Sequence, residues 1–213
     1  MLVQSLSCAT AVTMAGVVAL ASAASPVSAQ EDPRSMFPGR RIGGGTRGEC
    51  NARIVAHLVP VSSVFAPGET GGLGLVQGPT AQPLSLQVSF RSHSEESAER
   101  PMVRTFGAAP AAVVLFQNQV TGPTIWESAF DCTATDGAAL QDPLAFVQTA
   151  SPPALSLLMS EAEDGDVRVQ KGLTELRRQC GSDVPTQLIM ARFGLADLVT
   201  PEWPSRLPVR CPF

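Results

Sequence analysis

Residues 84–91 read LSLQVSFR, and in this stretch every second side chain is apolar. The apolar positions are Leu84, Leu86, Val88 and Phe90. Because successive side chains of a β-strand point to opposite faces of the sheet, this alternation predicts a strand with one buried face.

Further short apolar stretches flank this strand and are separated by Gly and Pro turns. We expect strands at residues 52–59, 102–106, 111–116 and 124–132. Residues 61–83 are rich in Gly and Pro and have little periodicity, so we interpret them as a long loop or an edge hairpin. Many short strands separated by turns favour a small antiparallel β-sandwich.

The C-terminal third has a different pattern. Apolar residues recur at helical spacing between Val167 and Cys180, and Gly181 stands where a helix C-cap is expected. The apolar patterns at residues 155–163 and 186–199 are compatible with either a helix or a strand. The tail at 201–213 is rich in proline and is expected to lack order unless Cys211 anchors it. The predicted fold class is mainly β with a helical C-terminal portion (α+β).

The N-terminal segment has the features of an export signal. Residues 6–24 carry no charge, and Val27-Ser28-Ala29 fits a small-residue cleavage rule. We expect residues 1–29 to be a signal peptide, and the alternative is a retained membrane anchor. After cleavage we expect no stable membrane span.

The rest of the chain divides by composition into three parts. Residues 30–50 form an exposed lead-in rich in Gly and Arg, 51–150 a β-sandwich-like domain, and 151–213 the helical C-terminal portion of the same domain.

Four cysteines remain after the predicted cleavage: Cys50, Cys132, Cys180 and Cys211. An even number in an oxidising compartment predicts two disulfides, and four cysteines allow three connectivities. Pairing of sequence neighbours favours Cys50 with Cys132 and Cys180 with Cys211. Their wide spacing makes a four-thiolate zinc site improbable.

Charge and aromatic content exclude some classes of partner. The net charge is −4, only 16% of residues are charged, and aromatic residues make up 5%. Nucleic-acid binding needs a concentrated basic face, so we expect no nucleic-acid partner. We also expect no cofactor.

The stretch at 38–50, PGRRIGGGTRGEC, carries Gly43, Gly45 and Gly48 at the spacing of a dinucleotide fingerprint. No strand is expected before it and no helix after it, so a phosphate cradle is disfavoured. A flexible turn is the simplest interpretation. The alternative is an anion-binding nest assisted by Arg40, Arg41 and Arg47.

The same stretch, followed by Leu58-Val59-Pro60, resembles the opening of a family of secreted proteins, best known in cyanobacteria, catalogued as domain of unknown function 928. The match covers residues 38–60, with a weaker one at 124–132. The resemblance implies an exported β-rich domain with Cys50 and Cys132 at matching positions, and it implies no catalytic residue.

Two histidines and one acidic cluster are the remaining candidates for chemistry. His57 and His93 have no catalytic motif around them, so a structural role is favoured. The acidic residues Glu161, Glu163, Asp164 and Asp166 could bind a hard cation, but a solvated turn with Asp166 capping the following helix is favoured.

The sequence therefore predicts a non-catalytic binding or structural module of the bacterial envelope, located in the periplasm or outside the cell, whose partner it does not name. One alternative is a secreted hydrolase with a site around His57 or His93. Another is a calcium-dependent adhesion element.

Overall fold

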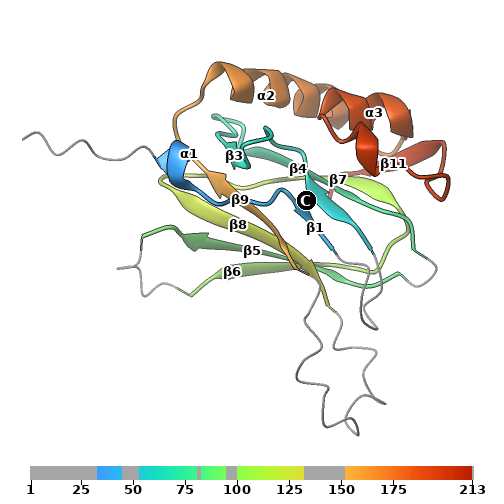
Figure 1. Ribbon diagram of the computed structural model, residues 1–213, viewed down its shortest axis with the longest axis horizontal. Coiled ribbons are helices and arrows are strands. Elements are labelled where there is room, and N and C mark those ends of the chain that lie inside the picture. The colour runs from blue at the N-terminus through green and yellow to red at the C-terminus, as the bar shows by residue number, and fades with distance from the viewer. Residues whose placement is uncertain (1–32, 45–52, 81–82, 95–99, 132–151, 213) are drawn as a thin grey trace, which may run out of the picture. The chain divides into compact units, whose positions relative to one another are not determined.

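Two stacked β-sheets form the body of the protein, and two helices near the C-terminus lie along one side of it (Figure 1). The computed structural model describes residues 33–44, 53–80, 83–94, 100–131 and 152–212. All of them belong to one compact unit, Asp32–Phe213. The predicted signal peptide at 1–29 lies outside the described residues.

The larger sheet has six strands. In spatial order these are β1 (Ile42–Gly43), β2 (Val55–His57), β4 (Gly72–Gln77), β7 (Ala112–Gln117), β11 (Arg206–Arg210) and β10 (Asp183–Pro185). Neighbouring strands are antiparallel except β7 and β11, which are parallel.

The second sheet has five strands. In spatial order these are β3 (Val64–Phe65), β9 (Ala154–Leu158), β8 (Thr124–Phe130), β5 (Leu86–Ser92) and β6 (Met102–Phe106). Only β3 and β9 pair in parallel. The predicted mainly-β sandwich is confirmed, with two parallel pairs that make both sheets mixed.

The alternation at residues 84–91 is confirmed in β5. Leu86, Val88 and Phe90 are buried, whereas Gln87 and Arg91 are exposed. The buried side chains join a core that also contains Trp126 and Phe116 from the two sheets. Burial of this apolar surface is the main force that holds the sheets together.

The predicted loop or edge hairpin at 61–83 is wrong, because β4 lies inside the six-stranded sheet and pairs on both sides. Its Gly74 is required by close packing. A Cβ at Gly74 would lie 2.6 Å from Leu173 of the helix α2 (Asp164–Arg177) and 2.9 Å from Leu115. The glycine therefore lets the helix approach the strand closely.

The helices cover the outer side of the six-stranded sheet. Helix α2 confirms the predicted helix and contacts β4, and α3 (Thr186–Arg192) continues along the same side (Figure 1). Two further short elements are α1 (Pro33–Met36) and the 3-10 helix η4 (Ala196–Leu198). No helix within the described ranges is long and apolar enough to cross a membrane.

The two segments whose patterns were compatible with either a helix or a strand form different structures. Residues 154–158 form strand β9, whereas residues 186–199 contain α3 and η4.

The C-terminal tail is anchored in two ways. Its strand β11 lies between β7 and β10, and Cys211 forms a disulfide with Cys180, 31 residues earlier. The second predicted pair, Cys50 and Cys132, lies outside the described residues. The confirmed disulfide is consistent with an oxidising compartment outside the cytoplasm.

Candidate functional site

His57 lies in the interior and joins the two sheets. It comes from β2, and its ring nitrogens are hydrogen-bonded to serines of the opposite sheet. The Nδ1 to Ser156 Oγ distance is 2.8 Å, and the Nε2 to Ser128 Oγ distance is 2.9 Å. Its ring also stacks on the Trp126 indole at a centroid distance of 3.5 Å, and the Trp126 Nε1 donates to Ser128 Oγ.

This histidine is held in its neutral form. The side chain has no exposed surface, and burial lowers the pKa of His57 well below 6.5. Both serines are equally buried. A neutral imidazole can donate from one nitrogen and accept at the other, so the two hydroxyls satisfy it without a carboxylate.

His93 is exposed and lies at the far end of β5. It contacts the edge of the Phe37 ring at a centroid distance of 6.1 Å. It lines a shallow cavity of about 470 Å³ together with Arg91 and Arg100. No acidic side chain of the described residues lines this cavity.

Two of the arginines proposed for an anion nest, Arg40 and Arg41, donate to backbone carbonyls instead. Arg41 is buried, and its Nη1 donates to the carbonyls of Val59 and Phe193 at 2.8 Å each. Its Nη2 donates to the Gly194 carbonyl at 2.7 Å. These last carbonyls follow α3, so Arg41 caps the end of that helix. Arg40 is exposed and donates to the Pro153 carbonyl.

The glycine stretch has a packing role where it is described. A Cβ at Gly43 would lie 2.1 Å from the Ala154 backbone nitrogen, so the glycine allows β1 to approach the start of β9. Arg47 and the remaining glycines of the predicted fingerprint lie outside the described residues.

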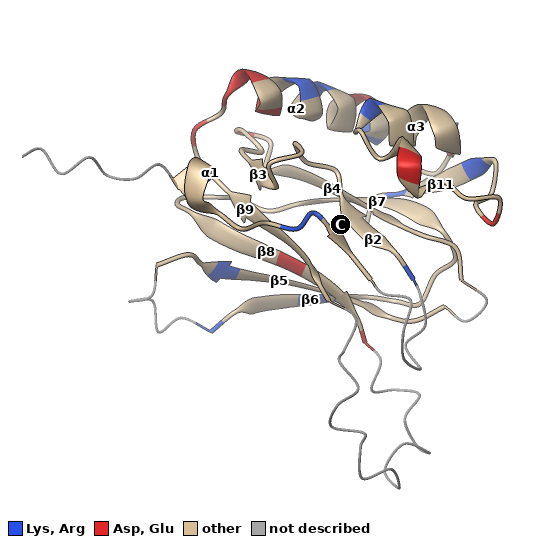
Figure 2. Ribbon diagram, in the orientation of Figure 1, with Lys and Arg blue, Asp and Glu red and all other residues tan. Residues whose placement is uncertain are grey.

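The acidic cluster marks the start of α2 (Figure 2). Asp166 is buried, accepts the Glu163 N–H at 2.9 Å and pairs with Arg34 at 2.9 Å. It therefore helps to cap the helix, but from the third helical position in a capping box with Glu163 as the N-cap, and in a buried ion pair in place of the predicted solvated turn. Glu163 also pairs with Arg34, while Glu161 and Asp164 are exposed. Within the described part of the chain, no group of three or more His, Cys, Asp or Glu could hold a metal ion.

A second buried arginine was not singled out by the sequence. Arg53 is only 2% exposed, its Nε donates to the Gly78 carbonyl at 3.0 Å, and its Nη2 donates to the Ala109 carbonyl. The guanidinium lies 4.9 Å from the centre of the Phe130 ring. Its Nη1 has no hydrogen-bond partner among the residues that the structure describes.

A cavity of about 510 Å³ lies at one end of the sandwich, and Arg53 reaches its wall without lining it. Ala109, which accepts from Arg53, lines it, and so do Arg210 and Gln77. The Gln77 side chain is 1% exposed, and its Oε1 has no partner in the described part of the chain. Among the residues that line this cavity, Gln77 is therefore a buried polar side chain with an unused acceptor.

Sequence reasoning gave no signal for this cavity. Arg53 stands alone before an apolar run, and Gln77 ends a stretch that was interpreted as a loop. Only the pairing of β2, β4 and β7 brings these residues to one end of the sheet.

No protein-family model, no curated protein and no solved structure matches this chain. Function is therefore inferred from the geometry of its own residues.

Proposed function

We propose that the protein is an exported, non-catalytic binding module of the bacterial cell envelope or the extracellular space. The observation that supports this proposal is the location of the histidine and serine side chains relative to the surface cavities. His57, Ser128 and Ser156 are sealed in the interior and line none of these three cavities. His93, Ser92 and Ser94 do line one cavity, but no acidic side chain of the described residues lies there to orient the histidine.

The geometry of His57 disfavours a secreted hydrolase whose site is built around that residue. A serine nucleophile must meet its substrate, and its base is normally oriented by a third group. Here both serines that flank His57 have no exposed surface, and the ring is satisfied by two hydroxyls. Strands β8 and β9 would have to separate from β2 before a substrate could reach either hydroxyl.

Export is supported by the Cys180–Cys211 disulfide, because disulfides persist in oxidising compartments. The signal peptide at 1–29 and membership of the family catalogued as domain of unknown function 928 stay predictions. Both concern parts of the chain that include residues outside the described ranges.

A serine-reactive fluorophosphonate probe tests the non-catalytic proposal. The folded protein should remain unlabelled, as measured by intact mass, while an unrelated serine hydrolase in the same reaction is labelled. Labelling of Ser128 or Ser156 that disappears in His57→Gln would overturn the proposal and favour a hydrolase.

Intact mass of the protein recovered from the cells that make it tests export. We expect a chain that begins at Gln30 and thiols that react with an alkylating reagent only after reduction. A full-length chain with freely reactive Cys180 and Cys211 would contradict export.

A further inference from the structure

Two arginines lie near the cavity of about 510 Å³: Arg210 lines it, and Arg53 donates to its wall residue Ala109. Among the described residues, neither Arg53 nor Arg210 forms an ion pair. Burial, with a smaller contribution from the positive charge of Arg210, lowers the pKa of Arg53 to about 10. Arg53 is therefore still protonated at neutral pH, and two like charges interact across this end of the sandwich.

Hydrogen-bonding capacity at the same place is unused. Arg53 Nη1 is a buried donor without a described acceptor, and the Gln77 amide presents an unpartnered Oε1. An amide can rotate to exchange its oxygen and nitrogen, so Gln77 can offer either an acceptor or a donor. An unmet buried polar group destabilises the folded state, and a bound partner would recover this loss.

The rest of the cavity is apolar. Its walls include Phe106, Val114 and Val209, which come from β6, β7 and β11. The volume of about 510 Å³ lies within the range of pockets that hold small molecules. A ligand that fits must therefore carry an apolar body as well as a charged head.

We propose that this cavity binds a small aliphatic carboxylate, with its head group at Arg210 and Gln77 and its chain against the apolar walls. Arg53 adds positive charge from behind the wall residue Ala109. A carboxylate accepts two parallel hydrogen bonds from a guanidinium, and such charge-assisted bonds are about twice as strong as neutral ones. The inference rests on the proposed function, since it names the ligand class of the binding module.

Calorimetric titration of the whole protein with octanoate tests the inference, with octan-1-ol as the uncharged probe of equal chain length. We expect saturable binding of octanoate and at least tenfold weaker binding of octan-1-ol, because only the carboxylate carries a charge that pairs with Arg210. No binding of octanoate up to about 10 mM would overturn the inference, since it places the affinity below the millimolar range.

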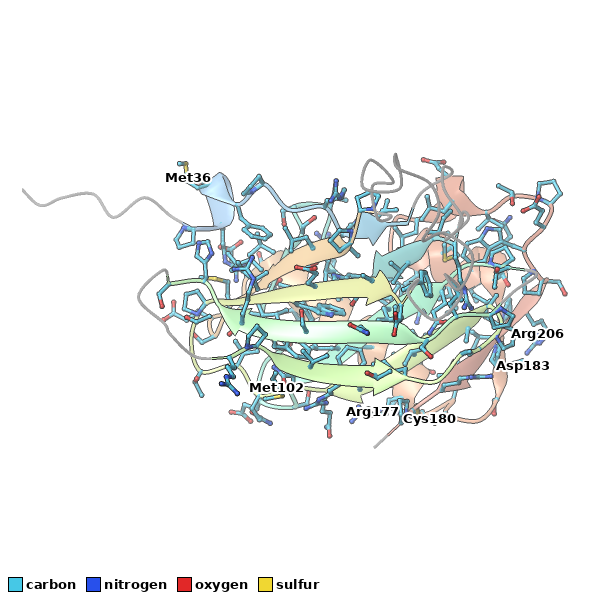
Figure 3. All side chains as sticks on the ribbon, turned by 90° about the horizontal axis from the view of Figure 1, so that it is seen from below. Met36, Met102, Arg177, Cys180, Asp183 and Arg206 are labelled. Atoms are coloured by element: carbon cyan, nitrogen blue, oxygen red, sulfur yellow. A yellow bond between two sulfur atoms is a disulfide. The ribbon has the colours of Figure 1, made fainter. Side chains whose placement is uncertain are left out.

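Three variants show where the ligand binds. Arg210→Gln removes an exposed head-group contact, and Gly107→Phe fills the cavity from a position whose Cβ meets nothing within 4 Å. Each should weaken octanoate binding about tenfold or more, equivalent to about 1.4 kcal/mol. Arg206→Gln is the matched control, because Arg206 is an exposed arginine of the same strand that donates to the Asp183 carbonyl (Figure 3).

The outcomes separate specific binding from attraction by net charge and from apolar partition. If Arg206→Gln and Arg210→Gln weaken octanoate binding equally, net charge alone attracts the anion. If octan-1-ol binds as tightly as octanoate, the cavity does not recognise the carboxylate. Either result overturns the inference. If octanoate does not bind and the fluorophosphonate probe does not label the protein, the binding-module proposal stands and only the carboxylate ligand is withdrawn.

Discussion

The buried neutral His57 predicts that the protein loses stability as pH falls through the range in which a free histidine is protonated. In the unfolded chain the imidazole takes up a proton near pH 6.5, whereas the folded chain keeps it neutral because its pKa is lowered by burial. The unfolded state therefore binds more protons below about pH 6.5, and the free energy of unfolding falls as pH decreases towards the folded pKa.

The size of this effect follows from linkage. The slope is about 1.4 kcal/mol per pH unit once the unfolded histidine is protonated, so lowering the pH from about 7.5 to about 5 should cost about 2 kcal/mol. Ordinary carboxylates titrate near pH 4 and contribute little in this window.

Urea unfolding at the two pH values measures the difference, with the disulfide kept intact. A His93→Gln background makes His57 the only imidazole, since the chain has two histidines. Adding His57→Gln should lower stability at both pH values but abolish the pH dependence. The same free energy of unfolding at both pH values in the His93→Gln protein would refute the buried neutral assignment.

Three further predictions concern stability and are checked by denaturant unfolding. Replacing Cys180 and Cys211 together by Ala opens a loop closed across 31 residues and should cost about 3–4 kcal/mol, and an unchanged midpoint would contradict a formed disulfide. Arg41→Leu leaves three carbonyls without their donor and should cost about 3 kcal/mol, whereas a neutral effect would mean that these carbonyls find other partners. Gly43→Ala should destabilise the protein strongly, because the new Cβ would meet backbone atoms at 2.1 and 2.5 Å. Gly107→Ala is the control, since open space surrounds its Cβ, and it should change stability by less than about 0.5 kcal/mol. Equal effects of the two substitutions would contradict the packing of β1 on β9.

Local patterns predicted the strands whose two faces differ. Alternation marked β5 because one of its faces is buried and the other is partly exposed. Strand β4 gave no such signal, since five of its six residues are buried and Gly72 and Gly74 resemble loop residues. The reason for Gly74 lies in Leu173, about a hundred positions away, which packs where its side chain would be.

The proline-rich tail shows a similar limit. Strand β11 pairs with β10 through Arg206 to Pro208 and with β7 through Val209 and Arg210. Pro208 therefore stands where only one neighbour is paired, which a residue without an N–H tolerates. The sequence suggested that Cys211 could anchor the tail, but not which strand the tail would join.

The two buried arginines show why burial alone does not identify a binding residue. Both lie in the interior without a carboxylate partner among the described residues, and burial lowers the pKa of each. Arg41 donates to three carbonyls, two of them just beyond α3, so its charge completes a helix end.

Arg53 differs because its environment is incomplete. Arg53 donates to two carbonyls, but its Nη1 has no partner among the described residues. Burial and, to a smaller extent, the positive charge of Arg210 lower the pKa of Arg53. Burying a charge is costly unless it is paired or fully hydrogen-bonded, so an anion in the neighbouring cavity would offset the charge of Arg53 and stabilise the folded state. Octanoate should accordingly raise the thermal unfolding midpoint of the wild-type protein and fail to raise that of Gly107→Phe, and an equal rise in both would place the anion elsewhere.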